Sequence, residues 1–164
     1  MDKNNEHRDI LFGYSNVPAC GREGKDDGGF SVAVYKDGRL IYKTYIYDQK
    51  DRTETEYKIS AGSVSAIKAL MKKHQRAIDT FDSYLYNGSC DGYGNFFIFN
   101  GKQVITWNIS YRNPLFLIFC IGCFSVARQE NKILSLFFTV TEILKNDGIS
   151  INLNGVAFSK GIDC

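Results

Sequence analysis

The sequence predicts an α+β fold, with an antiparallel or mixed β-sheet of about six to eight strands built from three hairpins and two helices packed on one face. Three dipeptides, Asp37-Gly38, Asn100-Gly101 and Asn154-Gly155, each lie between apolar, aromatic-rich runs. Such pairs tolerate the positive φ angles of a two-residue type I′ hairpin turn. Two other segments space their apolar residues three and four apart, which is typical of helices.

The first hairpin is expected over residues 30–47, after a glycine-rich loop at residues 16–29. A two-residue turn at residues 37–38 pairs Val34 with Ile41, and it pairs Tyr42 with Ala33. The apolar face that contains Val34 then packs on the core. Tyr42 therefore falls on the other face of the sheet.

A helix is expected over residues 63–81, with Ser60 or Ser63 as its N-cap. The apolar residues of this segment share one helical face, which we expect to contact the core. The opposite face is basic, and it consists of Lys68, Lys72, Lys73 and Arg76. Such a face can contact RNA, DNA or an acidic protein, but a charged helix face most often contacts only water.

The second hairpin is expected around Asn100-Gly101, where the turn pairs Phe97 with Val104 and Gly94 with Trp107. An aromatic ring over a glycine fixes the register of a hairpin. Both faces of this hairpin are rich in apolar residues, so we expect it near the centre of the sheet. One core is then predicted to contain Ile105, Trp107, Leu70 and Phe137.

The last third of the chain predicts a buried strand, a helix and a hairpin. Residues 115–127 are nearly all apolar, and a run of thirteen residues is too short for a membrane span, which needs about 20. We therefore expect a buried strand there. A second helix is predicted over residues 130–145, and the final hairpin follows around Asn154-Gly155.

Composition places few limits on function. The 164 residues fit a single domain, 1–164, in which the polar residues 1–9 are expected to form a flexible tail. The formal net charge of +2 gives no reason to expect a nucleic-acid or membrane partner. The five cysteines are irregularly spaced and the amino terminus resembles no signal peptide, so reduced thiols in a cytoplasm are expected.

Cys120 and Cys123 form the one motif with an obvious chemistry, since a dithiol of this spacing performs redox exchange when the first cysteine caps a helix. In a strand, residues three apart point to opposite faces. The apolar neighbours favour the strand and inert, buried thiols. A metal site is not expected, because no second ligand pair lies at local spacing, and nothing in the sequence calls for a cofactor.

Two groups of residues are candidates for binding. Asp91 and Tyr93 lie in a glycine-rich loop before the second hairpin, and with His74 they are the candidates to line a small pocket. Arg22, Tyr42 and Tyr47 are of the types enriched at protein interfaces, although the tyrosines are equally suited to packing within the sheet.

The expected function is that of a cytoplasmic, non-enzymatic protein-binding module of the inhibitor, immunity or regulatory type. This expectation depends on the tyrosine-rich hairpin and on a sheet that carries helices on one face only. The alternative is a small enzyme or thiol-redox protein that uses Cys120 and Cys123 or a pocket near Asp91. The sequence does not decide whether the chain has catalytic activity, and it leaves the oligomeric state open.

Overall fold

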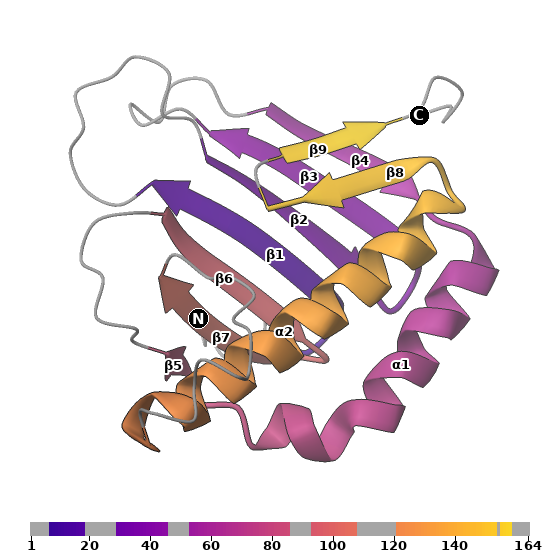
Figure 1. Cartoon of the computed structure of the whole chain (residues 1–164). Helices are drawn as coiled ribbons and strands as arrows, with labels where there is room; N and C mark the ends of the chain where they lie inside the picture. Colours follow the sequence, from indigo (N-terminus) through magenta and orange to yellow (C-terminus); the bar gives the residue numbers. More distant parts are fainter. Residues whose placement is uncertain are drawn as a thin grey trace.

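A computed structural model describes residues 7–18, 29–45, 53–85, 93–107, 121–153 and 155–158. Seven strands form one mixed sheet in the order β4-β3-β2-β1-β6-β7-β5, and two further strands, β8 and β9, pair with each other (Figure 1). The elements are β1 (Ile10–Pro18), β2 (Gly29–Tyr35), β3 (Arg39–Tyr45), β4 (Thr53–Lys58), α1 (Ala61–Asp79), β5 (Tyr84–Leu85), β6 (Tyr93–Phe99), β7 (Lys102–Trp107), α2 (Ile121–Lys145), β8 (Ile149–Asn152) and β9 (Gly155–Phe158).

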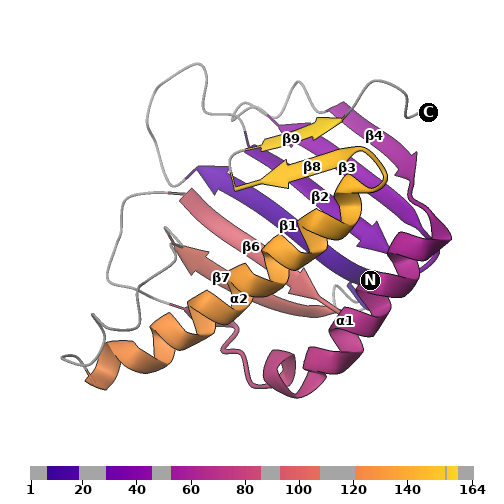
Figure 2. The ribbon, with the colours of Figure 1, turned by 45° about the vertical axis from the view of Figure 1, so that its right-hand side comes forward.

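The helices α1 and α2 lie on the same face of the sheet, and α2 crosses it diagonally (Figures 1 and 2). This arrangement confirms the α+β fold. All neighbouring strands of the large sheet are antiparallel except β5, which runs parallel to β7. The expectation that all three hairpins share one sheet is wrong, because β8 and β9 form a separate pair on the helix side.

The core lies between the sheet and the helices, and aromatic rings fill its centre. Phe137 of α2 is fully buried, and its ring centroid lies 6.1 Å from that of Phe12, 4.9 Å from that of Tyr14 and 5.8 Å from that of Phe97. Such tilted and edge-to-face pairs add to the stabilisation that burial alone provides. One helix residue therefore joins the two central strands, β1 and β6.

The second hairpin has the predicted register. Phe97 pairs with Val104 and Gly94 with Trp107, and both turn residues have positive φ, 48° at Asn100 and 84° at Gly101. These are the angles of a type I′ turn. A Cβ added at Gly94 would lie 3.4 Å from the Trp107 ring, which is a van der Waals contact, so the indole lies directly against this glycine.

The predicted placement of Trp107 in the core is wrong. Alternate residues of β7, Val104 and Thr106, are fully buried on the helix side. Ile105 and Trp107 alternate with these two residues, so they lie on the opposite face of the sheet, where they are half-buried. The hairpin is apolar on both faces, but helices cover only one of them.

The register of the first hairpin differs from the prediction by one residue. Val34 pairs with Leu40, and Tyr42 pairs with Val32. The connection has three residues, in which only Gly38 has positive φ, 91°, whereas a type I′ turn needs two such residues. The side chain of Asp37 accepts hydrogen bonds from the backbone N and the Nε of Arg39, at 3.1 and 2.7 Å, which stabilises this wider turn.

The last hairpin turns earlier than predicted, because Asn152 pairs with Gly155 and Leu153 belongs to the connection. The carbonyl of Leu153 accepts hydrogen bonds from the Tyr14 hydroxyl at 2.8 Å and from Asn16 Nδ2 at 3.0 Å. The Tyr14 hydroxyl also lies 2.8 Å from Asn95 Oδ1. This buried polar cluster of Tyr14, Asn16, Asn95 and the Leu153 carbonyl attaches the connection to the large sheet.

Helix α1 agrees with the prediction, with Ser60 as N-cap accepting a hydrogen bond from Ser63 N at 3.1 Å. Helix α2 is longer than predicted and begins at Ile121. Residues 121–127 are thus helical, and the expected strand over residues 115–127 is wrong for that part. Residues 115–120 lie outside the described residues. Ala127, Glu130 and Ile133 are all buried at a spacing of three, which extends one buried helical face toward the amino end.

Candidate functional site

Three of the binding and redox residues that the sequence suggested, Tyr42, Tyr93 and Cys123, lie within the described part of the chain. Tyr93 is the first residue of β6, and Cys123 lies in the first turn of α2. The strand expected for the dithiol is therefore wrong at Cys123, because this residue is helical. The remaining candidates lie outside the described residues, and they are Arg22, Tyr47, Asp91 and Cys120. Their binding and redox roles stay predictions.

Tyr42 is described, but it lies on the opposite face to the one predicted. It pairs with Val32, whose side chain faces the helices, and its ring centroid is 6.3 Å from that of Phe30. Burial, with a smaller contribution from Tyr57, raises the pKa of the Tyr42 hydroxyl above its ordinary value. Tyr42 therefore packs against the core, because the one-residue change of register moved it to the helix side.

The face of the sheet turned away from the helices, called the outer face here, is apolar at one end and charged at the other. Because side chains alternate along each strand, its residues can be assigned from the pairing. The apolar end comprises Phe96, Ile98, Ile105, Trp107 and Tyr84, and the charged end comprises Arg39, Lys43, Glu54, Glu56 and Lys58, with Ile41 among them. Small side chains separate the two ends, namely Gly13, Ser15, Ser31 and Ala33.

The apolar end is ordered by its own contacts. Trp107 Nε1 donates a hydrogen bond to the Tyr84 hydroxyl at 2.9 Å. Tyr84 itself is 52% exposed, which is the largest exposure among the large hydrophobic side chains of the described residues. At the charged end, Lys43 Nζ lies 2.8 Å from Glu54 Oε2. The outer face thus has an aromatic end with Tyr84 exposed, and charges that are partly paired.

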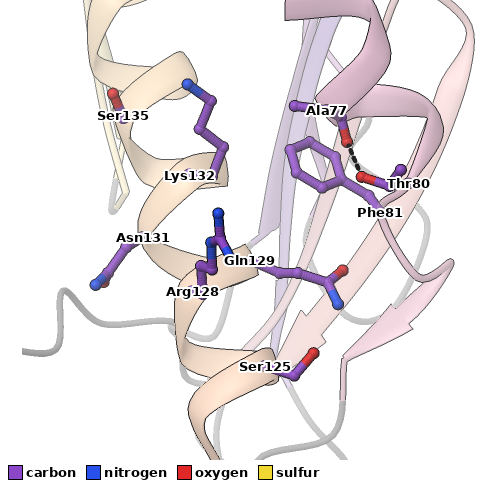
Figure 3. A pocket seen from close by; sticks show the side chains of 9 residues that line it. All are labelled: Ala77, Thr80, Phe81, Ser125, Arg128, Gln129, Asn131, Lys132 and Ser135. Atoms are coloured by element: carbon purple, nitrogen blue, oxygen red, sulfur yellow. Dashed lines mark hydrogen bonds between the residues drawn. The ribbon is translucent and has the colours of Figure 1, made fainter. Parts of the chain in front are cut away.

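A second candidate site is the pocket between the carboxyl end of α1 and the first half of α2, called the inter-helix pocket here (Figure 3). Its volume is about 720 Å³, which lies within the range of small-molecule sites. Phe81 is buried and forms the apolar wall with Ala77. The other lining residues are Thr80, Ser125, Arg128, Gln129, Asn131, Lys132 and Ser135.

A pair of reciprocal hydrogen bonds fixes one end of this pocket. Gln129 Oε1 accepts from the backbone N of Asp82 at 2.9 Å, and Gln129 Nε2 donates to Asp82 Oδ2 at 2.7 Å. These bonds join α2 to the segment that follows α1. The separation of the two helices at this point is therefore set by side-chain hydrogen bonds as well as by packing.

Two lysines, one from each helix, act on His74 of α1. Burial lowers the pKa of His74 below its ordinary value, and the nearby charges of Lys132 and Lys73 lower it further. Lys132 comes from α2 and Lys73 from α1, so cations from both helices act on one imidazole.

A smaller pocket of about 290 Å³, called the lysine pocket here, lies on the other side of α1. Lys68 and Lys72 of α1 and Lys36 of the first hairpin line it over a floor of Leu11 and Met71, beside Gln75 and Asn100. Lys36 Nζ is also 4.0 Å from Asp9 Oδ1. Together the two pockets are lined by five cationic side chains and, among the described residues, by no acidic one, although the whole chain carries only +2.

Among the described residues, no group of three or more His, Cys, Asp or Glu side chains is arranged to hold a metal ion. The helices within this part of the chain are also too short or too polar to cross a bilayer. The fold and these sites define an α+β protein in which, among the described residues, helices cover one face of the large sheet and not the other. The sequence matches no model of a known protein family and no curated protein sequence.

Sequence reasoning missed Arg128 and Lys132. The predicted helix began at residue 130, which left Arg128 outside it and hid the i, i+4 spacing of the two cations. That spacing was the available signal, since residues four apart share a helical face. The outer face was foreseen as an open surface, but its aromatic residues were assigned to the core.

Proposed function

We propose that this protein is a non-enzymatic protein-binding module of the inhibitor, immunity or regulatory type, which works in the cytoplasm and binds its partner on the outer face of the sheet. The observation that carries the proposal is the aromatic end of that face, where Tyr84 is exposed and its hydroxyl accepts a hydrogen bond from the half-buried Trp107. Tyrosine and tryptophan are enriched among the residues that dominate binding energies. The predicted binding role of Tyr42 is not retained, because its side chain packs against the core.

The composition of the outer face supports a protein partner. An apolar centre with a polar rim is the usual anatomy of a protein interface, and here the aromatic end adjoins small side chains and then charged ones. The charged end contains both signs, with Lys43 and Glu54 paired. A partner with an apolar patch bordered by mixed charges fits this arrangement, whereas a polyanion does not.

The size of the outer face supports a partner other than a second copy of the chain. Strands about 4.8 Å apart and about six residues long give a seven-stranded face of roughly 600 Å². A standard interface between two different proteins buries about 800 Å² on each side, and obligate homodimers bury more and are more apolar. The outer face is therefore suited to a non-obligate complex with one folded partner.

The test compares two exposed aromatic residues on opposite sides of the molecule. Tyr84 lies on the outer face and is 52% exposed, and Phe138 lies on α2 and is 45% exposed. A partner is first captured from the native host and purified, and its affinity for Tyr84→Ala and Phe138→Ala is then measured by calorimetry. We expect Tyr84→Ala to weaken binding by about tenfold, as for an interface residue of intermediate importance, and Phe138→Ala to leave it unchanged.

Two outcomes contradict the proposal. One is wild-type affinity in Tyr84→Ala together with loss of affinity in Phe138→Ala, which would move the contact to the helix layer. The other is a concentration-dependent dimer of the isolated protein, detected by sedimentation equilibrium and abolished by Tyr84→Ala. That result would make a second copy of the chain the occupant of the outer face.

A further inference from the structure

The inter-helix pocket has the features of a small-molecule site, and it is separate from the outer face. It lies on the helix side of the sheet, between α1 and α2 (Figure 3). One wall is apolar, formed by Phe81 and Ala77, and the other is a polar face of α2. A concave site that combines an apolar wall with a few polar groups is the usual composition of a ligand pocket.

The polar wall carries two cations that the described residues do not neutralise. Arg128 and Lys132 lie one turn apart on the face of α2 that borders the pocket, and no ion pair to either is formed within the described ranges. None of the described lining residues is acidic. The pocket therefore presents a guanidinium and an ammonium group to any molecule that enters it.

Hydrogen-bonding side chains surround these cations on the same wall. Ser125 and Ser135 contribute hydroxyl groups, both from α2. A planar guanidinium binds two oxygens of one anion at once, and an ammonium group supplies three further donors. A phosphate group has enough acceptor oxygens to use this set of donors, and its charge of up to −2 matches the two cations.

We propose that the inter-helix pocket binds a small phosphate ester, with the phosphate held by Arg128 and Lys132 and an apolar group of the ligand packed against Phe81. This site goes beyond the proposed function and does not depend on it, since the two surfaces share no residue. The environment of His74 supports the proposal. Burial is the main cause that lowers its pKa, and the charges of Lys132 and Lys73, one from each helix, lower it further.

The experiment is a titration of the full chain with three probes, which are adenosine monophosphate, inorganic phosphate and adenosine. Calorimetry gives the affinity, and NMR spectra of the backbone amides identify the residues that respond. We expect adenosine monophosphate to bind most tightly, inorganic phosphate more weakly and adenosine very weakly, with the largest changes at residues 125–135. Binding of the anion is also expected to raise the pKa of His74, because it offsets the nearby positive charge.

Two variants test the cations, and a third is the matched control. Arg128→Gln and Lys132→Gln are expected to weaken binding of adenosine monophosphate by about tenfold each, the usual loss for a hydrogen bond to a charged group. Lys68→Gln removes the same charge from α1 but lines the lysine pocket instead, and it is expected to change the affinity less than twofold. Thermal unfolding of each variant confirms that it is folded.

Three results overturn the proposal. The first is that no probe binds at about 10 mM, which is on the order of ten times a weak Kd of about 1 mM. This result would show that the pocket is not a phosphate site. Equal binding of adenosine and adenosine monophosphate would show that the anion is not recognised. Equal weakening by Lys68→Gln and Lys132→Gln would show that the attraction is general to the basic surface rather than specific to the pocket.

Discussion

Replacing Phe137 by alanine is expected to lower the free energy of unfolding by about 3–5 kcal/mol, the usual cost of removing a buried phenyl ring. Phe137 is fully buried, and its ring contacts those of Phe12, Tyr14 and Phe97 on the two central strands. The substitution would leave a cavity between helix α2 and the sheet. Both elements border this cavity, so the surroundings can collapse only in part. Urea denaturation followed by circular dichroism measures the loss.

The next residue in the chain is the control. Phe138 is 45% exposed, and Phe138→Ala is expected to cost less than about 1 kcal/mol. The two variants remove the same side chain from adjacent positions of one helix, so they share the same change in helix propensity. A loss of similar size in both would mean that α2 does not present Phe137 to the sheet.

Tyr14→Phe is expected to destabilise the protein by about 1–3 kcal/mol, although it removes a single oxygen atom. The Tyr14 hydroxyl lies 2.8 Å from both Asn95 Oδ1 and the carbonyl of Leu153, and Tyr14 is 1% exposed. Water cannot easily replace the lost hydroxyl there. Because Leu153 lies in the connection between β8 and β9, the amides of β8 are expected to exchange with solvent faster in the variant.

Tyr35→Phe is the matched control for this prediction. Tyr35 is half-buried at the end of β2, with the Arg39 guanidinium 4.8 Å from its ring centroid. That contact involves the ring and survives the loss of the hydroxyl. We expect a change of less than about 0.5 kcal/mol in unfolding free energy, and unchanged amide exchange in β8. An equal effect of Tyr14→Phe and Tyr35→Phe would contradict the role of the buried polar cluster.

The turns illustrate how far local sequence determines the fold. At Asn100-Gly101 the two residues adopt the positive φ angles that their chemistry favours, and the predicted register is correct. At Asp37-Gly38 the same type of dipeptide forms a three-residue connection, in which Arg39, outside the dipeptide, binds the Asp37 carboxylate. A change of one residue in register reverses the face of every side chain that follows in the strand.

The candidate sites were harder to predict for two physical reasons. A short apolar run fits a buried strand as well as a buried helix, so the start of α2 and the position of Arg128 could not be read from it. Trp107 shows the second reason. An apolar residue is suited to either face of a sheet, and only the tertiary arrangement decides that the helices cover Val104 instead.

The central claim is that the helices cover one face of the sheet and not the outer face, since the proposed binding surface depends on it. The most direct test adds a soluble paramagnetic gadolinium chelate and measures the relaxation of assigned methyl groups by NMR. We predict strong enhancement at Ile41, Ile98 and Ile105 on the outer face, and almost none at Val32 and Val104 beneath the helices. Equal enhancement of the two groups, or the reverse order, would contradict this account.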